Sequence, residues 1–285
     1  MKDTYLVDNY SINCKGNLID LSTSKVMSII NTTPDSFYDG GKNNTINNAL
    51  TKIENDLNYG ASFIDIGGYS SKPNANNVSE KEEINRTIIY IEQILKRFPK
   101  TIISIDTFRS KVASLAIEAG ASIINDISAF ELDNKMLDTI IKYNVPYVLM
   151  HMQGEPKNMQ NNPVYKNPVK EVFDFISKKI KTLNNCGIND IIIDPGFGFG
   201  KSISHNYSIM GNLSLFKELK QPILVGISRK SMISKLLKIS SIETLNGTTA
   251  LNMYALSNGA KILRVHDVKQ AIECIKIHNE ITKNI

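Results

Sequence analysis

Eight short apolar runs divide this chain, each bounded by Gly, Pro, Asn or Asp and followed by a longer segment with helical spacing. The runs are continuous, which indicates strands covered on both faces, as in a parallel sheet wrapped by helices. Eight such units in one domain favour the α/β class and a (β/α)8 TIM barrel. A doubly wound sheet is the alternative, but it usually needs fewer units. The expected strands are 26–30, 63–66, 102–105, 122–124, 147–150, 191–193, 223–226 and 262–265.

The segments around these runs complete the barrel. Ser79 and Glu82 predict a capping box at the start of one helix, and Pro99 ends that helix. Residues 1–25 precede the first expected barrel strand, and we expect an N-terminal extension there, a small hairpin closing one end. Residues 26–285 then form a single barrel domain, because no linker or change of composition divides them.

Composition limits the functional classes. The chain has 285 residues, 42% of them apolar, and its net charge of +5 comes from lysines spread along the sequence, so no nucleic-acid partner is expected. We find no apolar segment with the length of a signal peptide or membrane span, so we expect a cytoplasmic protein without a membrane partner. Cys14, Cys186 and Cys274 lack pairing or metal-ligand spacing and are interpreted as reduced thiols, without a disulfide or a zinc site.

Polar or glycine residues lie at the C-terminal end of every expected strand. In a barrel these positions meet at one mouth, where active sites of this fold are built. Each residue alone is more often a turn residue or a helix cap. Together they must satisfy one another or a ligand, because burying polar groups unpaired costs several kcal/mol. They are Asn31, Gly67, Gly68, Asp106, Asn125, Asp126, His151, Asp194, Ser228, Arg229, Lys230, Arg264 and His266.

Several segments resemble the bacterial dihydropteroate synthases. They are 31–37 (NTTPDSF), 151–154 (HMQG), 194–201 (DPGFGFGK), 228–231 (SRKS) and 264–267 (RVHD). The resemblance runs from about Val26 to the C-terminus. It implies a barrel, a homodimer, Mg2+ as cofactor and a sulfonamide target in folate biosynthesis. The implied transferase joins (7,8-dihydropterin-6-yl)methyl diphosphate to 4-aminobenzoate and releases diphosphate.

The resemblance also implies a pterin pocket. The two carboxylate oxygens of Asp194 match the amino group and the ring N–H on one edge of a pterin. Asp106 and Asn125 resemble the family's other pterin contacts, and Lys230 is expected to donate to the ring carbonyl or to an acceptor nitrogen. The expected apolar walls, which without the resemblance would be ordinary packing, are Met150 and Phe199.

A diphosphate leaving group calls for cations and a metal ion where negative charge develops. Arg264 and His266 are two residues apart on one strand, so their side chains point to the same side. Asn31 resembles the family's Mg2+ ligand, and an amide oxygen suits a hard, mostly hydrated Mg2+. Outside this context Asn31 would be a turn residue and His266 a core histidine. The expected catalytic residues are Asp106, Lys230, Arg264 and His266.

The second substrate, 4-aminobenzoate, carries an amine that is already neutral and nucleophilic at pH 7. No strong base or nucleophile triad is therefore expected, and we expect a dissociative substitution that depends on positioning and electrostatics. Ser231, at an expected helix N-terminus, is either a ligand of the aminobenzoate carboxylate or a helix cap. By resemblance alone, the loops that close over this substrate carry Phe37, Ser71 and Pro73.

One loop departs from the family pattern. The family commonly has Glu, Thr and Arg at the positions of Tyr69, Ser71 and Lys72. Lys72 keeps the charge expected to bind diphosphate but lacks the planar fork that grips phosphate through two hydrogen bonds. Losing one such bond costs roughly 1.5–3 kcal/mol. Lys72→Arg should thus lower the Michaelis constant for the pterin diphosphate by about ten- to a hundredfold in steady-state assays. An unchanged or higher constant would contradict this role.

Two rival functions share the pterin-binding residues. A barrel that transfers a methyl group from a folate to a corrinoid would need no diphosphate site, so Arg264 and His266 argue against it. A non-catalytic pterin-binding paralogue is conceivable because of the altered loop at Lys72. Diphosphate release with both substrates and Mg2+ distinguishes these readings from the synthase.

Overall fold

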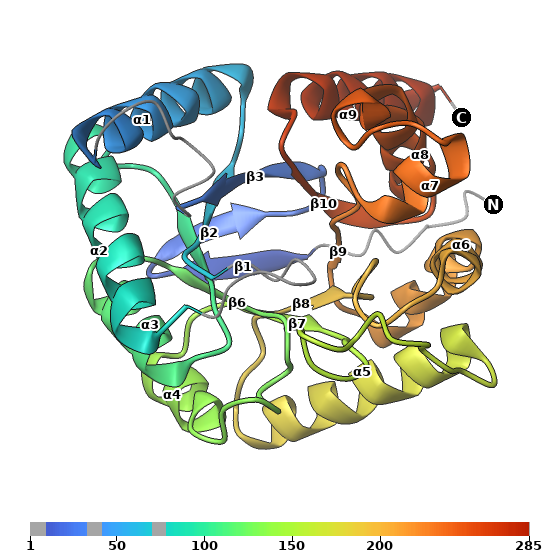
Figure 1. Ribbon diagram of the computed structural model, residues 1–285, viewed down its shortest axis with the longest axis horizontal. Coiled ribbons are helices and arrows are strands. Elements are labelled where there is room, and N and C mark those ends of the chain that lie inside the picture. Colours follow the sequence, from blue (N-terminus) through green and yellow to red (C-terminus); the bar gives the residue numbers. More distant parts are fainter. Residues whose placement is uncertain (1–9, 33–41, 70–77, 285) are drawn as a thin grey trace, which may run out of the picture.

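The computed structural model describes residues 10–32, 42–69 and 78–284. Eight parallel strands form a closed barrel in the order β10-β3-β4-β5-β6-β7-β8-β9, and Figure 1 shows the helices in a ring around it. All eight expected strands are confirmed to within two residues at each end, and the TIM barrel with them. Their bounds are β3 Lys25–Asn31, β4 Phe63–Gly67, β5 Ile103–Asp106, β6 Ile123–Asp126, β7 Tyr147–Met150, β8 Ile191–Asp194, β9 Ile223–Val225 and β10 Ala260–Val265.

The helices follow the strands as the sequence predicts. α2 begins after Ser79, whose hydroxyl accepts the N–H of Glu82 at 3.2 Å, and it ends at Arg97, shortly before Pro99. The Glu82 carboxylate pairs with Arg86 at 2.7 Å, so only the Ser79 half of the predicted capping box forms. The helices are α1 Lys42–Tyr59, α2 Glu80–Arg97, α3 Ser110–Glu118, α4 Met136–Tyr143, α5 Pro168–Asn185, α6 Ile203–Gly211, η2 Leu213–Leu219, α7 Ser231–Leu237, η3 Ile242–Thr244, α8 Leu245–Ser257 and α9 Val268–Lys283.

Successive side chains along each strand point alternately to the surrounding helices and into the barrel. Outward residues such as Ile64 and Ile66 pack against the helices in the main apolar core. At the N-terminal end of the barrel the inward residues form an apolar layer of Met27, Phe63, Ile123, Val148, Ile192, Leu224 and Ile262. The inward positions one level higher include Asp65, Asn125, Asp194 and Arg264. The interior is therefore apolar at one end and polar at the other.

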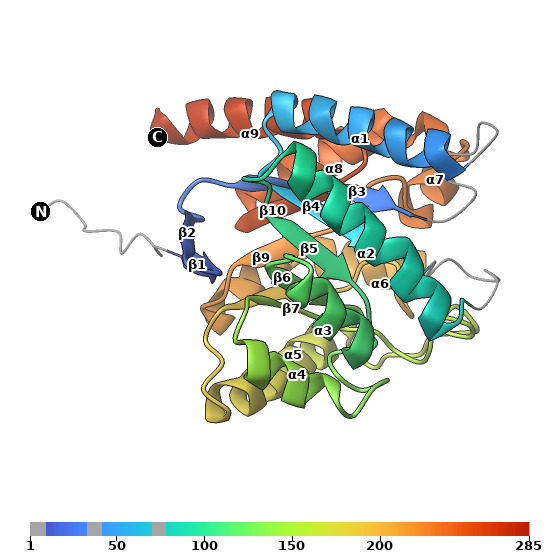
Figure 2. The same cartoon turned by 90° about the vertical axis from the view of Figure 1, so that its left-hand side faces the viewer.

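A hairpin packs against the apolar end of the barrel. β1 (Ser11–Cys14) pairs antiparallel with β2 (Asn17–Asp20), and Ile12 and Cys14 are buried in the same cluster as the bottom layer. Figure 2 shows the hairpin at the end opposite to the one at which the strand arrows point. Lys15 and Gly16 both have positive φ, 52° and 89°, as a two-residue hairpin turn requires. The C-terminal ends of the strands are thus left for a site.

No helix within the described ranges is both long and apolar enough to cross a bilayer.

Candidate active site

Arg264 lies at the centre of the polar cluster in the upper barrel. Its Nε donates to Asp65 Oδ2 at 2.6 Å, and its Nη2 donates to Asp106 Oδ2. Asn125 Nδ2 donates to the same Asp65 oxygen at 3.1 Å. The structure therefore brings Asp106, Asn125 and Arg264 together, from β5, β6 and β10.

The sequence interpretation missed Asp65, which is fully buried in the middle of β4. It lies inside an apolar run, and not at its end, so the search of strand ends passed over it. A signal was present, because Asp is almost never fully buried unless it is paired. Its second oxygen, Oδ1, has no hydrogen-bond partner among the described residues.

Asp194 and Lys230 complete the cluster. Asp194 ends β8, and its Oδ1 accepts the N–H of Gly196 at 2.7 Å. A Cβ placed on Gly226 would lie 3.9 Å from both Asp194 Oδ2 and Arg264 Cδ. Glycine at 226 therefore places no side chain between this carboxylate and the Arg264 side chain.

The charged groups of this cluster lie close enough to influence one another's pKa values. Three buried or half-buried carboxylates, those of Asp65, Asp106 and Asp194, face the two cations Arg264 and Lys230. Burial raises the pKa of Asp106 to about 7, although Arg264 opposes the rise. Burial lowers the pKa of Lys230 to about 8, although Asp194 opposes the fall. Both groups change charge near neutral pH, as acid–base and binding groups of active sites commonly do.

An apolar cluster adjoins these charges. Met150 and Phe199 pack with Ile127, Met152 and Met159, and Phe108 contacts the same cluster. Lys230 Nζ lies 4.6 Å from the centroid of the Phe199 ring and donates to the Phe197 carbonyl. Polar groups at the edge and apolar side chains beside them suit a planar, nitrogen-rich ring.

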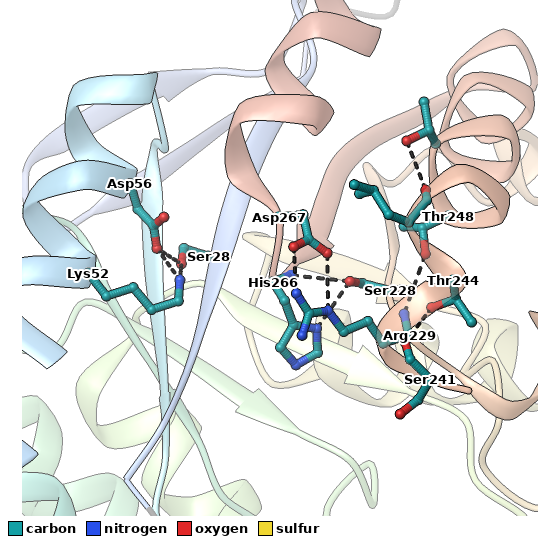
Figure 3. A network of polar contacts seen from close by, with 12 residues as sticks. Ser28, Lys52, Asp56, Ser228, Arg229, Ser241, Thr244, Thr248, His266 and Asp267 are labelled. Carbon is teal, nitrogen blue, oxygen red and sulfur yellow. Dashed lines mark hydrogen bonds and ion pairs between the residues drawn. The ribbon is translucent and has the colours of Figure 1, made fainter. Parts of the chain in front are cut away.

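His266 follows β10 and contacts Ser228, which follows β9 (Figure 3). The Ser228 Oγ lies 3.0 Å from His266 Nδ1 and accepts the His266 backbone N–H at 3.2 Å. Burial, followed by the cations Arg229 and Arg264, lowers the pKa of His266 to about 4. His266 is therefore neutral at pH 7, so it can offer an N–H to an anion but not a positive charge.

Some residues expected at the mouth point elsewhere. Asp126 accepts the N–H groups of Ser128 and Phe130 and the Tyr147 hydroxyl, each at 2.8 Å. Arg229 pairs with Asp267 at 2.6 Å, also visible in Figure 3. The expectation that every polar strand end meets at one mouth was thus wrong for Asp126, whereas Arg229 is held by Asp267 but lines one groove with His266.

His151 is a second correction of this kind. Its Nδ1 lies 2.9 Å from Lys201 Nζ, and its ring packs edge-on against the ring of Phe175, with 4.8 Å between the two ring centroids. Burial, with Lys201 beside it, lowers the pKa of His151 to about 2. Neighbouring residues on a strand point to opposite faces. His151 therefore faces out where Met150 faces in, as Asp126 does beside Asn125.

The remaining expected site residues lie at the rim or outside the described ranges. Asn31 ends β3, and a Cβ on Gly67 would lie 3.8 Å from both Asn31 Oδ1 and Asp106 Cγ. Ser231 is the first residue of α7 and is exposed, and the residue at the N-cap is Lys230. The expected loop contacts that fall outside the described residues are Phe37, Ser71, Lys72 and Pro73.

Comparison with known proteins identifies the family of this chain. The family model described as pterin binding enzyme matches residues 27–266. The dihydropteroate synthase of Haemophilus influenzae is 42% identical over 261 residues, 91% of this chain and 94% of that protein. That of Escherichia coli is 42% identical over 265 residues, 92% of this chain and 93% of that protein. The chain belongs to the dihydropteroate synthase family.

Solved dihydropteroate synthases have the same fold. The Yersinia pestis enzyme, in a complex with a sulfonamide drug, has a TM-score of 0.90 and 39% identity, covering 97% of this chain and 100% of that one. The Xanthomonas albilineans enzyme with 4-aminobenzoic acid has a TM-score of 0.90 and 35% identity, covering 96% and 98%. The family expected from the sequence is thus confirmed.

Proposed function

We propose that this chain condenses (7,8-dihydropterin-6-yl)methyl diphosphate with 4-aminobenzoate, giving 7,8-dihydropteroate and diphosphate. As a member of the dihydropteroate synthase family the chain is a transferase. The observation that carries the proposal is the meeting of Asp106, Asn125 and Arg264 at one end of the barrel, with Asp194 and Lys230 in the same electrostatic cluster. A solved relative, the Xanthomonas albilineans enzyme, is described in complex with 7,8-dihydropteroate.

In this proposal Asp194 holds the pterin ring. Its Oδ1 is fixed by the Gly196 N–H, which leaves Oδ2 on the side of Arg264 and Gly226. A carboxylate accepts from an amino group and a ring N–H together, which fixes both the position and the orientation of the ring. Lys230, Asn125 and Asp106 then form hydrogen bonds with the remaining polar atoms of the ring, and Met150 and Phe199 contact its faces.

The leaving diphosphate is assigned to Arg264 and His266. Arg264 is held by two carboxylates, so its position is set before the substrate binds. His266 adds a neutral N–H. A preorganised cation beside the breaking carbon–oxygen bond stabilises the charge that builds on the diphosphate oxygens as the electron pair leaves with them.

Mg2+ remains a proposal, supported by the donor set. Asn31 Oδ1 and the Asp106 carboxyl lie on either side of Gly67, whose missing side chain leaves room between them. Mg2+ keeps several waters and takes one or two oxygen ligands from protein beside substrate phosphates, so these oxygens fit it. Bound there, it would neutralise diphosphate charge, while Asn31 supplies its amide oxygen.

The reaction then needs little further chemistry from the protein. The pterin ring donates electrons to the exocyclic methylene as diphosphate departs, and the neutral amine of 4-aminobenzoate forms the new carbon–nitrogen bond and loses a proton. Ser231, exposed at the start of α7, is the proposed contact of the aminobenzoate carboxylate. Ser71 and Lys72, which lie outside the described residues, are proposed as further substrate contacts.

We expect kcat/KM for the pterin diphosphate to depend on pH as a bell. Asp106 must be ionised to accept a ring N–H, and since its pKa is raised to about 7, binding weakens as pH falls through that value. Lys230 must be charged to donate, and since its pKa is lowered to about 8, activity falls as pH rises through it. Asp106→Asn should remove the acidic limb from initial-rate profiles. A wild-type profile that stays flat between and beyond these values would contradict both assignments.

A homodimer and a cytoplasmic location complete the proposal. Large apolar side chains are exposed on α7, η3 and α8, which adjoin one another in sequence and space. They are Leu236, Leu237, Ile242, Leu245 and Tyr254, and Ile242 is 77% exposed. A grouped apolar surface of this kind marks a protein interface. A molar mass from analytical sedimentation that is twice that of the monomer, and that falls in the Ile242→Asp variant, would support the dimer. The cytoplasmic location is proposed from the sequence alone, in which we find no apolar segment with the length of a signal peptide or membrane span.

The function is tested by mixing the purified protein with both substrates and Mg2+ and following diphosphate and dihydropteroate together. The proposal requires equal amounts of the two products and no diphosphate release without 4-aminobenzoate beyond slow hydrolysis. Pterin binding without turnover would instead indicate the non-catalytic paralogue. Methyl transfer from a folate to a corrinoid, without diphosphate chemistry, would indicate the methyltransferase.

A further inference from the structure

The contact between Ser228 and His266 determines which ring nitrogen of the histidine carries the proton. One serine oxygen makes two contacts with the same histidine: it accepts the His266 backbone N–H at 3.2 Å and lies 3.0 Å from Nδ1. The backbone N–H can only donate. The open question is whether Nδ1 donates to the hydroxyl or accepts from it.

Burial of Ser228 decides this question. The residue is only 4% exposed, and the hydrogen-bond partners of its hydroxyl among the described residues are the backbone nitrogen and Nδ1 of His266. If Nδ1 carried a proton, the Ser228 hydroxyl would accept twice and its own proton would be buried without an acceptor. That arrangement costs about 1–3 kcal/mol. If Nδ1 is unprotonated, the hydroxyl donates to Nδ1 and accepts the backbone N–H, so that the hydroxyl, Nδ1 and the backbone N–H are all satisfied.

We infer that Ser228 is a positioning residue that fixes His266 as the tautomer with its proton on Nε2, and thereby makes His266 a neutral donor for the departing diphosphate. The second half of this inference rests on the proposed function. The first half rests on the two contacts alone.

The surroundings of His266 agree with a neutral donor. The positive charges of Arg229, Arg264 and Lys52 act against a positive charge on the ring, while Asp267, which is paired with Arg229, favours one; Lys52 is itself paired with Asp56. A second proton on the ring is therefore disfavoured. His266 also lines a groove of about 540 Å³ between α1 and the start of α9. A ligand can thus approach this histidine.

The tautomer matters for an anion. Nε2–H offers a hydrogen bond to a phosphate oxygen, whereas the other tautomer presents a lone pair and repels it. Without Ser228 both tautomers become accessible, and part of the protein meets the diphosphate in the wrong form. We expect Ser228→Ala to weaken diphosphate binding by roughly 3- to 10-fold, as for the loss of one neutral hydrogen bond. Ser228→Thr keeps the hydroxyl and should bind as the unaltered protein does.

The test is a long-range 1H–15N spectrum of the full chain with labelled histidines. The chain has four histidines, and the spectrum of His266→Gln identifies the signals of His266. The unaltered protein should show protonated Nε2 and unprotonated Nδ1 at pH 7. Ser228→Ala should move both shifts towards the values of a tautomer mixture, and Ser228→Thr should restore them. Diphosphate titrations by calorimetry on the same samples give the affinities.

Ser128→Ala is the matched control. Ser128 is also 4% exposed and follows a strand end, but its hydroxyl bonds to Asp126, away from the site. It should leave the His266 signals and the diphosphate affinity unchanged. A protonated Nδ1 in the unaltered protein would overturn the inference, as would equal diphosphate affinity in Ser228→Ala. The predicted spectrum together with absence of dihydropteroate formation would support the tautomer and contradict the proposed function.

Discussion

Asp194→Asn should lower kcat/KM for the pterin diphosphate by roughly 10²- to 10⁴-fold, because a site built on specific hydrogen bonds loses them outright when a donor replaces an acceptor. The amide oxygen of Asn can still accept the Gly196 N–H, which Asp194 accepts at 2.7 Å. Its NH2 group then faces the amino group and N–H of the ring, and two donors repel. The fold should suffer little, since the substitution removes a buried charge whose pKa burial raises.

Asp126→Asn is the control for that substitution. Asp126 is equally a buried aspartate at the end of a barrel strand, but its oxygens accept from Ser128, Phe130 and Tyr147 outside the lumen. We expect it to lower the free energy of unfolding by about 1–3 kcal/mol in urea titrations, while the affinity for a pterin analogue stays unchanged. Equal loss of pterin affinity in the two variants would contradict the distinction between inward and outward aspartates.

Arg264→Met should lower the free energy of unfolding by about 3–5 kcal/mol, because it leaves the carboxylates of Asp65 and Asp106 buried without their cation. Asp65 is fully buried, and Arg264 is its only cationic partner among the described residues. The same variant should show no measurable turnover, since the guanidinium assigned to the diphosphate is missing.

A double variant separates these two effects. Adding Asp65→Leu to Arg264→Met replaces a buried ion pair by apolar groups, which is often neutral or stabilising. We expect it to recover more than half of the lost stability in urea titrations, while turnover stays absent. Recovery of turnover in the double variant would show that Arg264 serves the fold alone. Full stability of Arg264→Met by itself would contradict the charge balance described for the cluster.

The sequence predicts most of the fold because its signals are local. Continuous apolar runs mark all eight strands of the barrel. The hairpin of β1 and β2 lies within the segment that precedes the first of these runs. Asp106, Asn125 and Asp194 could be predicted as candidates for a related reason, since each is polar at the end of a buried run.

The rest of the site depends on contacts across the barrel that no local pattern carries. Asp65 interrupts an apolar run and is stabilised by Arg264, 199 residues later in the chain. Asp126 and His151 were wrongly assigned to the mouth because each directly follows an inward-facing residue. Successive residues of a strand face opposite ways, so a shift of one residue moves a side chain from the lumen to the helices. The Ser228–His266 contact likewise joins two different strand ends.

The most direct test of the site is a crystal structure of the protein with the pterin-methyl diphosphate bound. The heterocycle should lie between Asp194 and Arg264, with its amino group and ring N–H within hydrogen-bond distance of Asp194. Lys230 and Asn125 should contact its other edges, and the diphosphate should lie beside Arg264 and His266. A pterin bound away from the lumen, or one whose donors face solvent while Asp194 contacts only protein, would contradict the account.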